Sequence, residues 1–258
     1  MTRITTILNQ KGGTGKSTTA HALATGLTHR GYKCLVVDAD AQGNISYTMQ
    51  ADPAKPGLYE AMRGDIAPSD AIQHTAQGDI ISSSLDLAGA DMEFTQTGRE
   101  YLLRETLEPI SADYTHIIID SPPALGIMSV NALTASGDVV IPVCPDIYSL
   151  QGLQQLLKNI DRVRKYSNPG IEIAGLLITR KGNGRAVATR ELIDAITDRA
   201  AGRSLYLYGA VIREAVAVKE AQIMRESLFD TAPKAKVTED YSRFIDEYLA
   251  QAAEAGRA

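Results

Sequence analysis

The stretch Asn9-Gln10-Lys11-Gly12-Gly13-Thr14-Gly15-Lys16-Ser17-Thr18 decides the fold. It lies between a strand-like apolar segment, Ile4–Leu8, and a helix-like segment, Ser17–His29. A glycine-rich loop in this position is typical of a phosphate-binding site, because glycines let backbone N–H groups converge on phosphate oxygens. The start of the following helix adds the positive end of its dipole. We therefore expect this loop to bind the phosphates of a nucleotide.

Two lysines in this stretch predict different contacts. Lys16 is placed to reach the β- and γ-phosphates, and the Ser17 hydroxyl is placed to bind Mg²⁺. Gln10 occupies the position at which the usual loop has its first glycine, and Lys11 follows it. Lys11 has no evident task within its own chain, because Lys16 already serves the phosphates.

Apolar runs alternate with segments of helical periodicity along the rest of the chain. The expected strands are Ile4–Leu8, Cys34–Val37, Ile80–Ser82, Ile117–Ile119, Val139–Val143, Ile173–Ile178 and Leu205–Val211. The expected helices are Ser17–His29, Arg99–Pro109, Ile127–Ala135, Leu150–Lys165, Arg185–Ala200 and Thr238–Ala255. This order predicts an α/β protein with a mainly parallel twisted sheet and helices on both faces. We expect residues 1–258 to form one domain, in which residues 50–79 make short helices and loops.

Three carboxylates follow two of the expected strands. Asp38 and Asp40 come after Cys34–Val37, and Asp120 ends the apolar strand Ile117–Ile119. Since open α/β sheets bind ligands at the carboxyl ends of their strands, we expect these side chains to lie near the glycine-rich loop. Asp120 has the Walker B position, from which it would hold a water of the Mg²⁺ shell or accept a hydrogen bond from the Ser17 hydroxyl.

Three segments resemble the ParA/MinD group of P-loop ATPases. Lys11–Ser17 is similar to the deviant Walker A motif of that group. Asp38–Asn44 resembles its Asp-x-Asp-Pro-Gln-Gly-Asn switch, with Ala41 in place of the proline, and Asp120–Gly126 resembles its Asp-x-Pro-Pro-x-Leu-Gly motif. The resemblance covers most of residues 3–180. It implies a P-loop NTPase that binds ATP and Mg²⁺ and hydrolyses ATP slowly.

The resemblance also implies roles for individual residues. Lys11 would reach across a homodimer to the partner's nucleotide and, with Lys16, take part in catalysis. Asp40 would orient or activate the attacking water, and Asp38 would support the magnesium region. Arg213 stands in the region of the group's Pro-Arg-Asn loop, which implies a place near the adenine base or the dimer interface.

Composition limits the class of protein. The chain has 258 residues, 44% of them hydrophobic and 22% charged, with a net charge of -5, which excludes a disordered or fibrous protein. No apolar run reaches the roughly 20 residues of a membrane-spanning helix, and the N-terminus lacks the pattern of a signal peptide. Cys34 and Cys144 both lie in apolar runs, so we expect buried thiols in a cytoplasmic protein.

Positive charge gathers late in the chain. Residues 151–236 carry 15 basic and 9 acidic side chains, whereas residues 1–150 carry 9 and 17. Solvated helix faces are one explanation, and a surface for non-specific DNA binding is the other, which the resemblance favours. The residues that we expect to contact DNA are Lys181, Arg185, Lys219, Arg225, Lys234 and Lys236, with Arg180 and Arg190 beside the first two.

Two functions share this nucleotide site. The first is that of the short ParA form, which dimerises on ATP, binds DNA without sequence preference on the nucleoid, and leaves site recognition to a ParB-like centromere-binding partner. The alternative is a MinD-like membrane-associated ATPase. Such proteins end in a basic amphipathic helix, whereas the segment Thr238–Ala255 is amphipathic but acidic, so we expect it to pack on the core and expect no membrane partner. The cysteine positions argue against a nitrogenase iron protein, and Lys11 argues against a small-molecule kinase.

Overall fold

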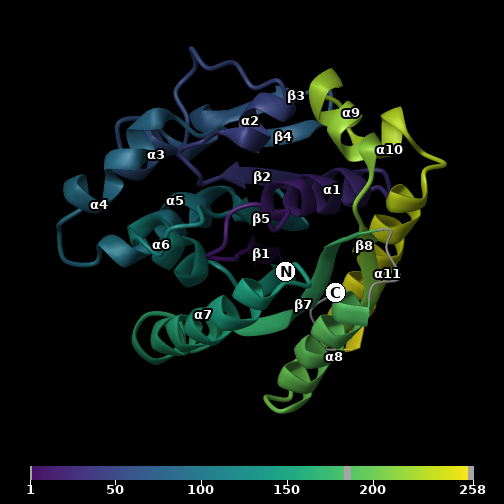
Figure 1. The fold of residues 1–258 in the computed structure, drawn as a ribbon. Coiled ribbons are helices and arrows are strands. Elements are labelled where there is room, and N and C mark those ends of the chain that lie inside the picture. The colour runs from purple at the N-terminus through teal and green to yellow at the C-terminus, as the bar shows by residue number, and fades with distance from the viewer. Residues whose placement is uncertain (1, 183–186, 255–258) are drawn as a thin grey trace.

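A computed structural model describes residues 2–182 and 187–254 of the protein (Figure 1). Its eight strands form one sheet in the order β3-β4-β2-β5-β1-β6-β7-β8, in which β3 alone runs antiparallel to its neighbour. The strands are β1 (Arg3–Ile7), β2 (Cys34–Asp38), β3 (Ile72–Thr75), β4 (Gly78–Ile81), β5 (His116–Asp120), β6 (Asp138–Val143), β7 (Glu172–Lys181) and β8 (Leu207–Arg213). The predicted α/β class with a mainly parallel sheet is therefore confirmed.

Helices cover both faces of the sheet (Figure 1). The α-helices of the described residues are α1 (Lys16–Thr28), α2 (Asn44–Thr48), α3 (Leu58–Arg63), α4 (Ala90–Glu93), α5 (Leu102–Ser111), α6 (Ile127–Ala135), α7 (Ile147–Tyr166), α8 (Val187–Ala201), α9 (Val216–Met224), α10 (Leu228–Thr231) and α11 (Lys236–Glu254). Single 3₁₀ turns occur at Pro68–Ala71, Leu85–Gly89 and Arg99–Tyr101.

The buried strands show why each face binds its helices. Successive side chains of a strand point to opposite faces, so Val36 and Ile118 pack under α1 and α11, whereas the adjacent Leu35 and Ile117 pack under α5 and α6. Alternate residues of β6 and β7 in the same way support α7 and α8. Both faces are apolar along the central strands, which is the pattern expected of a parallel sheet covered on both sides.

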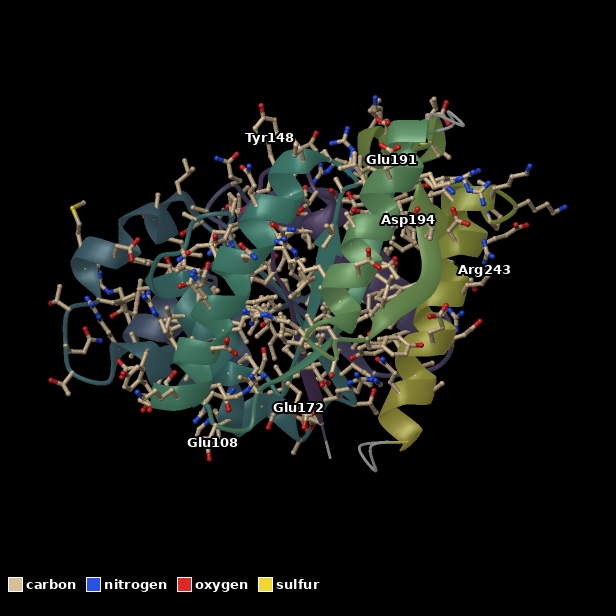
Figure 2. All side chains as sticks on the ribbon, turned by 60° about the horizontal axis from the view of Figure 1, so that its bottom comes forward. Glu108, Tyr148, Glu172, Glu191, Asp194 and Arg243 are labelled. Carbon is tan, nitrogen blue, oxygen red and sulfur yellow. The ribbon has the colours of Figure 1, made fainter. Side chains whose placement is uncertain are left out.

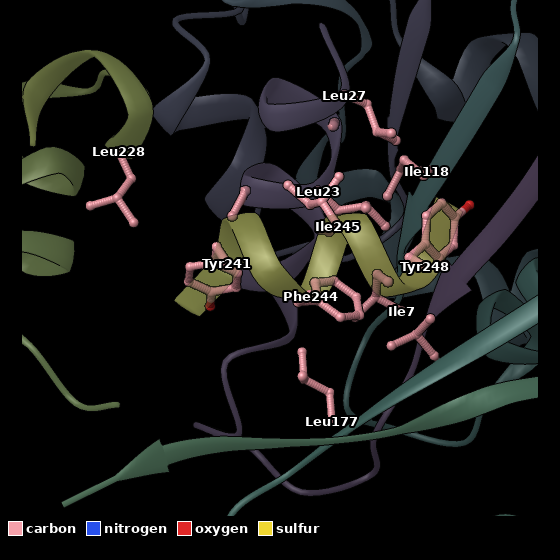
Figure 3. Packing of buried hydrophobic residues seen from close by; sticks show 14 of the residues in the cluster. Ile7, Leu23, Leu27, Ile118, Leu177, Leu228, Tyr241, Phe244, Ile245 and Tyr248 are labelled. Atoms are coloured by element: carbon pink, nitrogen blue, oxygen red, sulfur yellow. The ribbon is translucent and has the colours of Figure 1, made fainter. Parts of the chain in front are cut away.

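The C-terminal helix α11 packs across α1, as the acidic amphipathic pattern predicts (Figure 3). Tyr241, Phe244, Ile245 and Tyr248 of this helix are all buried. The Glu247 carboxylate accepts hydrogen bonds from the backbone N–H groups of residues 209 and 210, at 2.7 and 2.8 Å. The helix therefore also covers the free edge of β8, which would otherwise expose unpaired backbone groups.

Two local expectations need correction. Residues 72–75, placed in a region of loops and short helices, form strand β3, which pairs with β4 across a tight turn at Ala76–Gln77. Cys34 is buried as expected, but Cys144 is only half-buried, because it lies where β6 has already ended. Both thiols are free. In the described residues, no helix has both the length and the apolar character needed to cross a membrane.

Candidate nucleotide-binding site

The glycine-rich loop connects β1 to α1 and takes a backbone path that its glycines permit. Gly13 and Gly15 have φ angles of 74° and 82°, in the left-handed region that side chains with a Cβ disfavour. Gly15 is also the residue that precedes the first turn of α1, so the loop N–H groups and the helix start face the same side. The Thr179 hydroxyl at the end of β7 donates to the Thr14 carbonyl at 2.7 Å and so ties the loop to β7.

A cleft of about 1080 Å³ opens above this loop. Its walls come from the loop and α1, from the segments that follow β2 and β5, and from α4 and α9. The predicted residues Gly12, Gly13, Gly15, Lys16, Ser17, Thr18 and Asp40 all line it. The structure thus brings most of the predicted residues to one cavity, but Lys11, Thr14 and Arg213 are not part of its lining.

Asp120 lies at the bottom of this region with no exposed surface. Neither of its carboxylate oxygens has a hydrogen-bond partner of good geometry among the described residues. Burial, followed by the neighbouring Asp38, raises the pKa of Asp120 well above its ordinary value, and Ser17 and Lys16 act in the opposite direction. A buried carboxylate without partners, beside a serine hydroxyl, is a donor set that suits Mg²⁺ or its bound water.

The Mg²⁺ site needs few protein ligands. Among the described residues, no cluster of three or more histidine, cysteine or acidic side chains has the arrangement of a protein-only metal site. Mg²⁺ in nucleotide sites is normally held by one or two protein groups and by the phosphates, with water completing its shell. Ser17 and Asp120 therefore fit the metal that the sequence predicts.

Asp38 is also fully buried, but its carboxylate already accepts hydrogen bonds from Ser46. Register places Asp38 beside Asp120 on adjacent strands. Asp38 Oδ2 accepts hydrogen bonds from the Ser46 backbone N–H at 2.9 Å and from the Ser46 hydroxyl at 2.7 Å. Burial is the main reason that the pKa of Asp38 rises to about 6, and the bonds from Ser46 oppose it. Asp38 thus fixes the short helix α2 and the segment Asp40–Gly43 before it, whereas Asp120 is left free for an outside partner.

Lys16 faces this negative charge from α1. Burial lowers the pKa of Lys16, and the carboxylates of Asp120 and Asp40 act against that lowering. Its ammonium lies 3.5 Å from the Lys11 carbonyl, which places it inside the loop rather than in solvent. The site therefore holds one buried cation among three aspartates until phosphate and metal arrive.

Lys11 has a partner in its own chain, contrary to the expectation. Its ammonium lies 2.6 Å from the Asp146 carboxylate, which precedes α7. Asp146 also accepts hydrogen bonds from the Ser149 backbone and hydroxyl at 2.9 Å, as a helix cap does. Although partial burial opposes it, the bonds from Lys11 and Ser149 lower the pKa of Asp146. Lys11 is thus held outside the lining of the cleft by Asp146, a residue that the sequence did not predict for the site.

The basic residues of the late segment separate into groups. Arg213 reaches the margin of the nucleotide region, but its guanidinium makes two bonds to Asp240, at 2.6 and 2.7 Å. Lys219 lines the cleft itself. Arg225 Nε donates to the Tyr47 carbonyl at 2.7 Å, which ties α2 to the end of α9. Lys181, Arg190, Lys219, Lys234 and Lys236 are exposed, and Arg185 lies outside the described residues.

Two contacts were not predicted from the sequence, although a sequence pattern for the first of them is present. Asp146 and Ser149 have the spacing of a helix N-cap and its third residue, which predicts the start of α7. Arg180 donates from Nη1 to the Gly13 carbonyl at 2.7 Å. No local pattern indicates that contact, because it joins residues that are 167 positions apart.

Comparison with known proteins places the chain in a family. Residues 2–173 match the AAA_31 family, described as an AAA domain. The chain is 38% identical over 226 residues to the chromosome partitioning protein ParA of Caulobacter vibrioides, covering 85% of this chain and 83% of that protein. It is 32% identical to the chromosome-partitioning ATPase Soj of Thermus thermophilus, covering 96% of both chains.

A solved structure agrees with this relationship. The crystal structure named cobyrinic acid a,c-diamide synthase from Mycobacterium smegmatis, with a bound ATP analogue and magnesium, superimposes with a TM-score of 0.87. It is 31% identical in sequence and covers 100% of this chain and 97% of its own. The chain belongs to the ParA/Soj family of P-loop partition ATPases. As a member of that family it is a magnesium-dependent ATP hydrolase.

The isolated charge of Asp120 gives a prediction for the ligand-free protein. Asp120→Asn removes one of two adjacent buried carboxylates, so we expect the free energy of unfolding at pH 7.5 to rise by about 1–3 kcal/mol. Because folding raises the pKa of Asp120, the folded protein binds its proton more tightly than the unfolded chain does. The contribution of Asp120 to stability should therefore increase as the pH falls from 7.5 toward 5, whereas His21 and His116, whose pKa values are lowered by burial, act in the opposite direction.

Urea denaturation without nucleotide at pH 5, 6 and 7.5 measures this effect. The stability advantage of Asp120→Asn over the wild type should shrink as the pH falls, because only the wild type gains stability by protonating Asp120. Asp113→Asn removes an exposed carboxylate after α5 and should leave the wild-type pH profile in place. A variant Asp120→Asn that is less stable than wild type at pH 7.5 would contradict the assignment of Asp120 as an uncompensated charge.

Proposed function

We propose that this protein is a DNA-partition ATPase in which ATP binding assembles a homodimer that holds DNA without sequence preference. The whole chain, residues 1–258, would serve as one P-loop ATPase domain in the cytoplasm, on the nucleoid, with a ParB-like protein recognising the partition site. The observation that carries the proposal is the cleft lined by the glycine-rich loop, Lys16, Ser17 and Asp40, with the buried Asp120 beside Lys16 and Ser17. The named relatives at up to 38% identity over most of the chain support partitioning as its role.

The chemistry of the site depends on placement and charge. The loop N–H groups and Lys16 bind the phosphates, and Ser17 and Asp120 hold the metal region. Mg²⁺, when bound, neutralises charge on the β- and γ-phosphate oxygens. Asp40 lies 6% exposed on the cleft wall, where its carboxylate accepts the Gln42 N–H at 3.0 Å and is held toward the cavity. From there Asp40 orients a water for attack on the γ-phosphate.

Asp40→Ala tests this chemistry. The variant retains the loop, Lys16 and Ser17, so we expect ATP affinity within a few-fold of wild type and hydrolysis lower by at least about 100-fold. Steady-state phosphate release and isothermal titration with ATP and Mg²⁺ measure the two quantities. Asp52→Ala, an exposed carboxylate far from the cleft, is the control. Hydrolysis by Asp40→Ala at the wild-type rate would show that another group orients the water.

The surface around the cleft supports assembly of two copies. Tyr47 and Ile223 line the mouth of the cleft and are 63% and 80% exposed. Tyr148 projects from the start of α7 into solvent, near the Lys11 ammonium (Figure 2). Large apolar side chains that gather at one cleft mark a contact surface. A second copy placed there would bring its Lys11 to the nucleotide, where a cation stabilises transition-state charge.

In the proposed dimer, Asp146 and the phosphates of the partner's nucleotide would compete for Lys11. Lys11 must leave Asp146 before it can reach a partner's phosphate. Asp146→Asn keeps the cap of α7 but removes the charge, so we expect ATP-dependent dimerisation at about two- to fivefold lower protein concentration, the effect of a partly exposed ion pair. Lys11→Ala should stay monomeric with ATP. Sedimentation of both variants on the Asp40→Ala background measures the shift, and equal behaviour of all three proteins would contradict the sandwich arrangement.

We infer a smaller candidate DNA surface than the sequence suggests. Lys219 is exposed but lines the cleft, and Arg225 is bound to α2, whereas Lys234 and Lys236 are exposed at the start of α11 and lie outside the cleft lining. Arg243, also exposed, projects from the same helix (Figure 2). Two copies of this group in a dimer would contact one duplex together and multiply a weak, salt-screened attraction.

Lys234→Glu with Lys236→Glu tests that surface. We expect DNA affinity of the ATP-bound protein to fall by at least about tenfold at moderate salt, because each reversed charge removes a phosphate contact and adds repulsion. ATP-driven dimerisation should be unchanged. The control pair Lys33→Glu and Lys55→Glu makes the same charge change at exposed sites elsewhere. Equal loss in both pairs would assign the effect to net charge, and binding of the wild type to anionic liposomes rather than DNA would favour the MinD-like alternative.

A further inference from the structure

The hydrogen bonds that hold Asp40 come from two parts of the chain. Within its own segment, its N–H lies 3.3 Å from Asp38 Oδ1, its carboxylate accepts from the Gln42 N–H at 3.0 Å, and its carbonyl accepts from the Gly43 N–H at 2.9 Å. A further bond comes from Ser83, whose hydroxyl donates to the same carbonyl at 2.6 Å. Among the residues that the structure describes, Ser83 is the one hydrogen-bond partner of Asp40 outside this segment.

Ser83 also binds the beginning of helix α2. Its backbone N–H donates to the Ser46 hydroxyl oxygen at 2.9 Å, and that hydroxyl donates to the buried Asp38 carboxylate at 2.7 Å. The two groups of Ser83 therefore have separate partners, because the N–H holds Ser46 and the hydroxyl holds Asp40. A substitution that removes only the hydroxyl leaves the bond to α2 in place.

The chain that carries Ser83 is itself fixed where β4 ends. The preceding residue, Ser82, is buried, and its carbonyl accepts from the Leu58 N–H at 2.9 Å. The Ser82 hydroxyl accepts from Nε2 of Gln73 in β3 at 3.1 Å. A Cβ at Gly57 would lie 2.4 Å from the Ser82 carbonyl oxygen, so α3 begins directly against this residue. Contacts with α3 and β3 therefore give Ser83 a fixed support.

Ser83 stands close to the cleft without forming part of it. Strand β4 pairs in parallel with β2, with Ile81 opposite Val37, so the segments that follow the two strands leave the sheet at the same edge. Asp40 lines the cleft, whereas Ser83 is half-buried behind it and is not part of the lining. Any effect of the Ser83 hydroxyl on a bound nucleotide must therefore pass through Asp40.

We propose that Ser83 is a positioning residue for ATP hydrolysis, whose hydroxyl fixes the backbone of Asp40 so that the carboxylate meets the attacking water. This inference rests on the proposed role of Asp40. The bonds within the segment set the shape of the turn, whereas the bond from Ser83 sets its place relative to β4. Placement matters because an error of about 1 Å in a catalytic group can slow a reaction by about 100-fold.

Ser83→Ala tests the role of the hydroxyl. The Asp40 carbonyl keeps the Gly43 N–H in this variant, so no buried polar group loses its last partner. We expect hydrolysis to be about tenfold slower and ATP affinity to stay within twofold of wild type, because Lys16 and Ser17 are unchanged. Ser83→Thr keeps a hydroxyl on the same carbon and should retain at least about half of the wild-type rate. Single-turnover phosphate release and isothermal titration with ATP and Mg²⁺ measure the two quantities.

A double-mutant cycle separates positioning from a general loosening of the site. If Ser83 acts through Asp40, adding Ser83→Ala to Asp40→Ala should change the residual rate of hydrolysis by less than about twofold. An independent structural effect would instead multiply the two losses. Radiolabelled ATP with the enzyme in excess makes the low residual rates measurable.

Ser84→Ala is the matched control. It removes the hydroxyl of the adjacent half-buried serine, which lies 3.4 Å from the Asp86 carboxylate, and should change neither rate nor affinity. Wild-type hydrolysis by Ser83→Ala, a loss that Ser83→Thr does not restore, weakened ATP binding by Ser83→Ala, or a further tenfold loss on the Asp40→Ala background would overturn the inference. Wild-type hydrolysis by Asp40→Ala would instead contradict the proposed chemistry itself.

Discussion

The structure depends on negative charge that is buried where β2 and β5 end. Asp38 and Asp120 stand side by side with no exposed surface, and the attraction of Lys16 does not cancel their mutual repulsion. A charge buried without a full set of partners costs free energy. In the proposed function, a metal and phosphates bind at this carboxyl edge of the sheet and would supply the missing partners. Nucleotide affinity and the stability of the ligand-free protein are therefore opposed at this point.

Asp38 and Asp120 have different roles because their hydrogen bonds differ. Asp38 is tied to Ser46, so it holds α2 and the segment that carries Asp40. The backbone carbonyl of the next residue, Tyr47, accepts a hydrogen bond from Nε of Arg225 at the end of α9. Helix α9 in turn lines the phosphate cleft. A short series of direct contacts thus connects the buried aspartates to the surface around the cleft.

The sequence predicts the parts of this arrangement that local chemistry determines. The loop, Lys16, Ser17 and the aspartates follow strands, and parallel strands necessarily bring those ends to one edge, so the cleft was foreseeable. The partners of Lys11 and Arg213 were not, because Asp146 and Asp240 are distant in sequence and belong to helices whose positions depend on packing. Strand β3 was missed for a related reason. Its residues Ile72-Gln73-His74-Thr75 are half polar and become a strand only because β4 offers an edge to pair with.

The pair Lys11–Asp146 shows how one side chain can serve both a folded monomer and an assembly. Its two groups are each about one-third exposed, at 35% and 34%, so the pair contributes little to stability and is easily broken. A partner's phosphates carry more negative charge than one carboxylate, and enclosure between two copies would exclude the water that screens them. In the proposed dimer, the same lysine would therefore be held more strongly than it is in the single chain. Since Asp146 also caps α7, that exchange leaves the helix intact, and only the lysine has to move.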